Sequence, residues 1–479
     1  MHALILVHRW LGVACCLLFA MWFATGIVMH FVPFPALTEA ERLGGLAPID
    51  PSYARHGPAD AVTTSGIHDA TRVRLFARPD GLVYLVQGES TMNSVHAADL
   101  SQASVQSENL ALAIAADHAR RRGQDVASAT FAELASHDQW TVPNGLDPHR
   151  PLHRIALNDD AGTELYVSSI TGEVVRDTTR RERWWNYAGS VAHWIYPTAL
   201  RRNWRAWDTV VWTLSLVALI AAISGGLLGT LRIEVARGHI MSPYRNWHAW
   251  HHWLGLSSMV FVLTWTFSGW LSMDHGLLFS TGKPSAAESV NFASAAAWEK
   301  LSTREITLLP AQAREIEWFA FDGHIYRRER FDLVSQRLSH AGDASAAGRA
   351  FLQPDEVTAG AKRLAPGCAP AVAVHATDDY ALAPAMPTAP VYRSVCGEIW
   401  FHYDGANGAM LEKLDASRRA YRWAYTALHT FDFPVLTVHS ALRTILIVTL
   451  CGIGLVFSLT AVVIGWRRLR RDFPASKVS

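Results

Sequence analysis

Two histidines enclose the first apolar stretch of the chain. His8 and His30 stand at the ends of HRWLGVACCLLFAMWFATGIVMH. On an α-helix they would lie about 33 Å apart, close to the ~30 Å hydrocarbon thickness of a bilayer. Neutral imidazole is a good ligand for iron, copper and zinc, and an ionisable residue beside a bilayer indicates a functional site. The spacing therefore predicts a metal-binding imidazole near each membrane face.

The pattern recurs in HHWLGLSSMVFVLTWTFSGWLSMDH, from His251 to His275. Four residues of the first stretch return at one constant offset: His8, Trp10, Gly12 and Gly26 are repeated by His251, Trp253, Gly255 and Gly269. His30 aligns with Met273 and not with His275. We therefore expect His8 and His251 to be the firmer pair, at the inner level.

A second pair of segments repeats as well. YVSSITGEVVRDTTRRERWWNYAGSVAHWIYP aligns with WFHYDGANGAMLEKLDASRRAYRWAYTALHTFDFP, which matches His193 with His429. The chain is thus predicted to be two copies of one unit, in which a helix is followed by a soluble domain and a second helix.

Four windows are long and apolar enough to span a membrane. The short connection between the second and third windows carries Arg232, Arg237 and Arg245, and the chain continues after the fourth as WRRLRR. By the positive-inside rule both segments, and both termini, are cytoplasmic. The predicted division is membrane helices at 1–33, 207–231, 247–273 and 441–466, soluble domains at 34–206 and 274–440, a cytoplasmic loop at 232–246 and a cytoplasmic tail at 467–479.

The two long segments emerge on the other side, which is the periplasm in a bacterium. LVYLVQG, LHRIALN, EIEWFAFDGHIYRRERFDLV and EIWFHYDGANGAMLE have the alternation and turns of strands, whereas 110–123 and DEVTAGAKRLA have helical periodicity. Cys368 and Cys396 lie in such a segment, where a disulfide can form. The predicted fold is an integral membrane α-helical bundle of four transmembrane helices with two periplasmic α+β domains, arranged as an internal duplication.

The histidines favour haem over other metal centres. Acidic residues stand only at the ends of the spans, as Asp208 and Asp274, whereas zinc catalysis favours a nearby carboxylate. Two imidazoles from different helices suit a six-coordinate b-type haem, and Gly12 and Gly255, one turn after a histidine, would admit a flat ring. The candidate ligands are His8, His251 and His252, with His248 as a further possibility, at the inner level and His30, His193, His275, His429 and His439 at the outer level.

Other function classes lack support in the sequence. No CxxCH, GxSxG, HExxH or P-loop is present, and SGGLLG at 224–229 lies inside a predicted span. The net charge is +1, without the basic stripe that nucleic acid would require.

Two haems b would carry electrons across the membrane, supplied by a membrane quinol or a cytoplasmic donor.

HRWLG and HHWLG, the TGEVV turn and YRWAYTALHTFDF together resemble the PepSY-associated transmembrane family of bacterial inner-membrane proteins. The resemblance spans nearly the whole chain. It implies two periplasmic PepSY-like domains, haem, and reduction of periplasmic ferric siderophores by an oxidoreductase of the di-haem type. The first half has AHWIYP where the second has LHTFDF, so the resemblance supports His429 more directly than His193.

Two other functions remain open at this stage. The chain could be an electron conduit to another periplasmic acceptor. PepSY domains are also associated with restraining peptidases, which implies a membrane regulator without redox activity. Absorbance of the purified protein separates the redox functions from the regulator.

Overall fold

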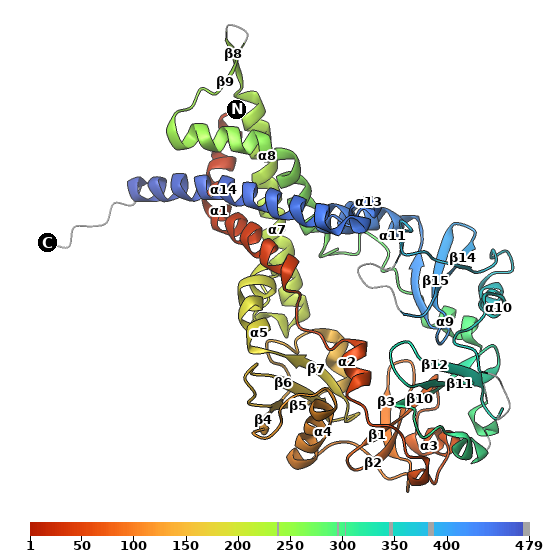
Figure 1. The fold of residues 1–479 in the computed structure, drawn as a ribbon. Helices are drawn as coiled ribbons and strands as arrows, with labels where there is room; N and C mark the ends of the chain where they lie inside the picture. The colour runs from red at the N-terminus through yellow and green to blue at the C-terminus, as the bar shows by residue number, and fades with distance from the viewer. Residues whose placement is uncertain (237–238, 295–296, 302, 344–347, 382–387, 473–479) are drawn as a thin grey trace. The chain divides into compact units, whose positions relative to one another are not determined.

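The computed structural model describes residues 1–479 except 237–238, 295–296, 302, 344–347, 382–387 and 473–479 (Figure 1). Arg237, one of the predicted cytoplasmic arginines, is outside the described residues. Contacts within the chain define two compact units. The helical unit comprises Met1–Phe34, Trp184–Ser280 and Arg419–Ser479, and the sheet unit comprises Pro35–Arg183 and Thr281–Arg418.

Four long helices dominate the helical unit: α1 (His2–Phe31), α7 (Trp204–Leu231), α8 (Asn246–Leu271) and α14 (Ser440–Asp472). All four are long and apolar enough to cross a membrane, which confirms the four predicted windows. A short hairpin, β8 (Glu234–Ala236) and β9 (His239–Met241), joins α7 to α8. The chain is therefore a multi-pass membrane protein in its helical unit.

The packing of these helices follows the duplication. α1 packs against α7 and α14, and α8 packs against the same two helices. α1 and α8, the repeated histidine helices, thus lie diagonally across the bundle. Glycine permits the close contact, because a Cβ atom at Gly454 of α14 would stand 2.6 Å from the ring of Phe23 on α1.

Each copy adds a broken helix that packs on α1 or α8. In the first copy α5 (Arg180–Asn186) continues as a π-helical turn, η3 (Tyr187–Val191). In the second, α11 (Ala416–Tyr421) continues as the π-helical turn η6 (Arg422–Ala427) and α12 (Leu428–Thr430). Two further short helices are α6 (Thr198–Arg201) and α13 (Pro434–Val438).

The histidine segments therefore lie outside the soluble domains to which the sequence assigned them. His193 and His429 fall within the helical unit, although the predicted domains ran to residues 206 and 440. Their helices pack against α1 and α8 rather than against the sheets. Periodicity alone does not reveal such a change of partner, because it identifies an apolar face but not what that face covers.

The sheet unit repeats the same order of elements in both halves. The first half contains α2 (Glu39–Gly44), α3 (Pro58–Ser65), β1 (Arg72–Arg78), β2 (Gly81–Gln87), β3 (Met92–His96), α4 (Glu108–Arg121), β4 (Thr130–Ala135), β5 (Leu152–Ala156), β6 (Glu164–Ser168) and β7 (Val174–Thr178). The second contains α9 (Ala286–Ala293), β10 (Glu315–Phe321), β11 (His324–Arg330), β12 (Gln336–His340), α10 (Pro354–Leu364), β13 (Val372–Ala373), β14 (Val391–Cys396), β15 (Ile399–Asp404) and β16 (Met410–Leu414).

The two halves share one sheet. Six strands run in the order β12-β11-β10-β1-β2-β3, with β1 antiparallel to β10, so that three strands of each half form one continuous ladder. Arg74 pairs with Glu317, and these residues are related by the same offset as His8 and His251. The register therefore places the two copies about a local two-fold axis at this pair. The expected α+β content is present. Two separate domains would each expose one strand edge, at β1 and at β10, but here these strands pair with each other.

Two smaller sheets complete the unit. β4-β5-β6-β7 belongs to the first half and β13-β14-β15-β16 to the second. Cys368 and Cys396 are joined by a disulfide in the second half. Cys15, Cys16 and Cys451 are buried free thiols and pack as small apolar residues.

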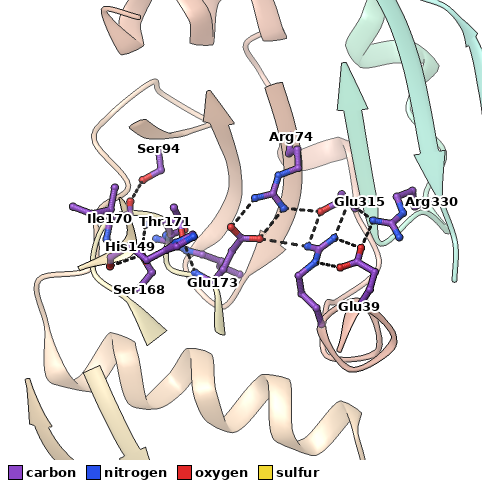
Figure 2. A network of polar contacts seen from close by, with 12 residues as sticks. Glu39, Arg74, Ser94, His149, Ser168, Ile170, Thr171, Glu173, Glu315 and Arg330 are labelled. Atoms are coloured by element: carbon purple, nitrogen blue, oxygen red, sulfur yellow. Dashed lines mark hydrogen bonds and ion pairs between the residues drawn. The ribbon is translucent and has the colours of Figure 1, made fainter. Parts of the chain in front are cut away.

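A buried ion network connects the two halves of the sheet unit (Figure 2). Glu315 of β10 is 1% exposed and accepts hydrogen bonds from Arg42 at 2.8 Å, Arg74 at 3.0 Å and Arg330 at 3.0 Å. Arg74 also pairs with Glu173 at 2.7 Å. Burial by itself would raise the pKa of Glu315, but the three guanidinium groups hold this pKa well below its ordinary value.

Replacing the central carboxylate tests the network. Glu315→Gln leaves three arginines without their shared charge, so we expect a loss of about 3–5 kcal/mol in the stability of the sheet unit. Thermal unfolding of the full chain in detergent measures it. The control is Glu133→Gln, whose ion pair with Arg154 is half-exposed. Equal midpoints for the two variants would contradict a stabilising role for the network.

The network also makes stability depend on pH. Burial raises the pKa of Glu39, but hydrogen bonds and charge from Arg42 and Arg330 outweigh this and lower it from 4.5 to about 2. A carboxyl group with a depressed pKa stabilises the fold fully above pH 4.5, and this stabilisation is lost as the pH falls towards 2. We expect the thermal midpoint to fall in this window and to fall less steeply in Glu39→Gln. Parallel profiles would refute the assignment.

Candidate functional site

The inner histidine pair lies across the diagonal of the helical bundle. His8 of α1 and His251 of α8 have ring centroids 6.3 Å apart and ring planes inclined by 32°. Nδ1 of His8 lies 3.2 Å from the carbonyl oxygen of Ala221, with the hydroxyl of Ser224 at 3.4 Å. Nδ1 of His251 lies 2.9 Å from the hydroxyl of Thr460. The diagonal packing of α1 and α8 thus brings together the two histidines predicted as the firmer pair.

The outer pair has the same construction. His193 and His429 have ring centroids 6.4 Å apart, with ring planes inclined by 64°. Nδ1 of His193 lies 2.9 Å from the hydroxyl of Thr25 on α1, and Nδ1 of His429 lies 3.2 Å from the hydroxyl of Ser268 on α8. Although the first half departs from LHTFDF, its histidine is placed as the second one is.

The four hydroxyl groups determine which ring nitrogen carries the proton. The hydroxyls of Thr25 and Ser268 donate to the carbonyls of Met21 and Thr264, each at 2.7 Å. Those of Ser224 and Thr460 donate to carbonyls of their own helices at 2.9 and 2.6 Å. A hydroxyl has one proton, so its remaining contact to the imidazole accepts an N–H from Nδ1. This tautomer leaves the lone pair on Nε2, and within the described part of the chain Nε2 of these four histidines has no hydrogen-bond partner.

Indole groups lock the backbone of the outer pair. Trp22 Nε1 donates to the carbonyl oxygen of His193 at 2.9 Å, and Trp265 Nε1 donates to that of His429 at 3.0 Å. Three residues further on, the repeats place a hydroxyl and then a glycine, Gly26 or Gly269. A Cβ atom at Gly269 would come within 3.2 Å of the His429 ring.

Sequence reasoning missed this WxxTG and WxxSG pair as a histidine-binding motif. The aligned repeats contain both motifs. Their partners become known only from the structure, in which the broken helices pack on α1 and α8.

The broken helices also end in an unusual way. Two residues after each histidine the backbone enters the left-handed region, with φ of 50° at Ile195 and 54° at Phe431. This conformation is costly for residues with bulky or branched side chains. The π-helical turns before His193 and His429, and these equivalent strained positions after them, mark both segments as constrained sites.

The spacing within each pair fits two imidazoles on one metal ion. Two metal–nitrogen bonds of about 2.0 Å, with about 1.2 Å from each nitrogen to its ring centre, place the centroids roughly 6.4 Å apart in a linear arrangement. The observed separations are 6.3 and 6.4 Å. No group of three or more potential metal-ligating residues is found among the described residues. Each pair brings two imidazoles together, which suits a cofactor that would provide the remaining ligands.

The remaining candidates have other partners. His252 uses both nitrogens, towards Ser242 and the carbonyl of Gly229, each at 2.8 Å. Nε2 of His30 lies 2.9 Å from the hydroxyl of Thr444. Nδ1 of His275 pairs with the carboxylate of Asp208.

Asp208 and Thr444 are equivalent in the two copies, so His30 and His275 make corresponding contacts at the ends of the helices. His439 and His248 have exposed side chains. None of these five histidines faces another across the bundle as the two pairs do.

The glycine that contacts the His8 ring is not Gly12, whose role in admitting a flat ring stays a prediction. No atom lies within 4 Å of a Cβ atom built at Gly12, and Gly255 contacts Phe457. The close approach is made by Gly225 of α7, where a Cβ atom would stand 2.6 Å from Cε1 of His8.

Gly225→Ala tests this contact. The added methyl group must displace the His8 ring and weaken its hydrogen bond to Ala221, so we expect the thermal midpoint to fall by an amount equivalent to about 1–3 kcal/mol. Gly12→Ala is the matched control, because its methyl group meets open space and alanine favours the helix. A Gly225→Ala variant as stable as Gly12→Ala would show that the ring is not held there.

Comparison with known proteins adds no relative to this geometry. No protein-family model matches the chain, and no curated protein matches it. Membership of the PepSY-associated transmembrane family thus stays a prediction from HxWLG and ALHTFDF, and function is inferred below from the two histidine pairs.

Proposed function

We propose that the chain is an inner-membrane reductase that holds two b-type haems and delivers electrons to ferric siderophores in the periplasm. The observation that supports it most strongly is that two histidine pairs, built alike from both copies, each hold two imidazole rings at the centroid separation expected for a shared iron. His8 and His251 would hold the inner haem, and His193 and His429 the outer one. Haem supplies one-electron chemistry when bound.

The residues around each pair have defined tasks. Ser224 and Thr460 hold the inner imidazoles, and Thr25 and Ser268 hold the outer ones, so that Nε2 is directed and unprotonated. Such second contacts orient a ligand and raise its basicity. Trp22 and Trp265 fix the backbone of the outer ligands, and the apolar helices exclude water.

The direction of transfer follows from the charge distribution. By the positive-inside rule, Arg232, Arg245 and the WRRLRR segment favour cytoplasmic termini. The inner pair would accept electrons from a membrane quinol or a cytoplasmic donor, and the outer pair would pass them on in the periplasm. Siderophores bind Fe(III) through hard oxygen donors, and one-electron reduction leaves Fe(II), which these donors hold less tightly. Iron release would follow.

Absorbance and haem stoichiometry test the cofactor. Protein expressed with haem supplied and purified in mild detergent is expected to contain two haems per chain, with a Soret band and sharpened α and β bands on dithionite reduction. Alanine at His8 or His251 removes one haem, and alanine at His193 or His429 removes the other, because each iron loses one of two protein ligands. His30, His252, His275 and His439 serve as matched controls that keep both.

Each contrary outcome has a definite meaning. A colourless preparation would exclude both redox functions and leave the PepSY-type regulator. Haem loss on replacing His252 or His275 instead would overturn the pairing. If haem is present, stopped-flow reoxidation of the reduced protein by ferric siderophores is expected to be faster than by a periplasmic electron-transfer protein. The reverse order would favour the electron conduit.

A further inference from the structure

Aromatic side chains fill the helical unit between the two histidine pairs. Phe23 of α1 contacts Trp265 and Phe261 of α8, with ring centroids 6.0 and 6.4 Å apart, and Phe261 lies 5.7 Å from Trp265. These rings belong to one buried cluster, which also includes Phe431 and Phe457. The distance to be bridged is large, because the rise from His8 to Thr25 along α1 corresponds to about 26 Å.

The cluster reaches both histidine pairs. At the inner level, the ring of Phe457 stacks on His251 with a centroid separation of 4.8 Å and an interplanar angle of 18°. At the outer level, Nε1 of Trp265 donates to the carbonyl oxygen of His429. The ring centroids of Trp265 and Phe431, which is two residues after His429, lie 5.2 Å apart. Phe23 and Phe261 lie within the same apolar cluster as these end members.

The duplication itself does not require these rings. At the equivalent positions of the other copy, Phe23 is replaced by Thr266, Phe261 by Leu18 and Phe457 by Ala221, whereas Trp265 is matched by Trp22. At these three positions one side of the pseudo-two-fold axis carries aromatic residues and the other carries small or aliphatic ones. Phe19, which lies 6.3 Å from Trp22, is the reverse case, because its equivalent is Val262.

The bundle is shaped to admit the central ring. Phe23 is buried, and the facing position on α14 is Gly454, where a Cβ atom would stand 2.6 Å from the ring. In the other copy, Ala218 of α7 is equivalent to Gly454, and Thr266 of α8 is equivalent to Phe23. The larger side chain on α1 and the smaller facing residue on α14 therefore occur together, on one side of the pseudo-two-fold axis only.

We infer that Phe23, Phe261 and Trp265 form an aromatic bridge through which electrons pass from the inner to the outer histidine pair, on one side of the bundle. This inference rests on the proposed function. Haem held at each pair would supply the one-electron chemistry, in which one iron is oxidised from Fe(II) to Fe(III) as the other is reduced from Fe(III) to Fe(II), with a quinol or dithionite as the source of the electron. The rings would keep their oxidation state, and no bond would form or break. Their π electrons would couple the two sites more strongly than saturated side chains across an equal gap.

Leucine substitutions test the bridge. Phe261→Leu introduces the residue that the other copy carries as Leu18, and Phe23→Leu removes the central ring. Dithionite-reduced protein is mixed with a ferric siderophore, and the two haems are followed spectroscopically. We expect haem content, both midpoint potentials and the fast outer phase to be unchanged. The slower inner phase is expected to decrease by about tenfold, equivalent to about 1.4 kcal/mol in activation free energy.

Matched variants separate this effect from packing. Phe267→Leu changes a partly exposed phenylalanine of α8 outside the cluster and is expected to react like the wild type. Phe261→Tyr keeps an aromatic ring and is expected to retain the inner rate. An unchanged inner phase in Phe23→Leu and Phe261→Leu, with both haems present, would overturn the bridge. A protein without haem would instead refute the proposed function, so the two failures are distinguishable.

Discussion

An imidazole can direct one nitrogen to a metal ion only if the other nitrogen has a partner, and inside a membrane that partner must come from the protein. This constraint explains the helical unit. A hydroxyl group that already donates to its own helix stands beside Nδ1 of each histidine, and at His8 the carbonyl oxygen of Ala221 is the nearer acceptor. The helices that carry these hydroxyls must therefore pack beside the histidine helices at a specific depth. The bundle arrangement, the glycines and the indole contacts all serve that alignment.

The duplication provides each histidine and its hydroxyl partner twice. A helix pair related by a pseudo-two-fold axis brings equivalent residues face to face, so one histidine in the ancestral unit becomes a pair in the duplicated chain. The same relation operates in the sheet unit, where equivalent strands β1 and β10 pair about Arg74 and Glu317. There the copies have diverged into opposite charges, and Glu315 gathers arginines from both halves. At these equivalent positions the two copies thus carry side chains of complementary charge rather than identical ones.

The same divergence distinguishes the two sides of the bundle. The histidines and their hydroxyl partners are retained in both copies, whereas Phe23, Phe261 and Phe457 have no aromatic equivalent. The ligands of the proposed haems must recur at each site, because each iron would need two of them. A route between the sites is needed only once, so it can be built on one side of the axis, from Phe23 of the first copy with Phe261 and Trp265 of the second.

Much of this organisation is determined by the sequence itself. Long apolar windows specify membrane helices because a bilayer accepts only segments whose backbone is satisfied internally, and the constant offsets reveal the duplication. The offsets also identify His8 with His251 and His193 with His429. Local alternation predicted the strands, since one face of each is buried.

Tertiary structure decided which of these elements meet. Only the packing of α5 and α11 with their π-helical turns assigns His193 and His429 to the helical unit, and only the pairing of β1 with β10 merges two expected domains into one sheet. It also distinguishes His252, whose two nitrogens are both engaged, from its neighbour His251. Most of these outcomes depend on contacts between residues far apart in the chain, such as Trp22 with His193 and Arg74 with Glu317. A local pattern records which side chains are buried but not which partners bury them.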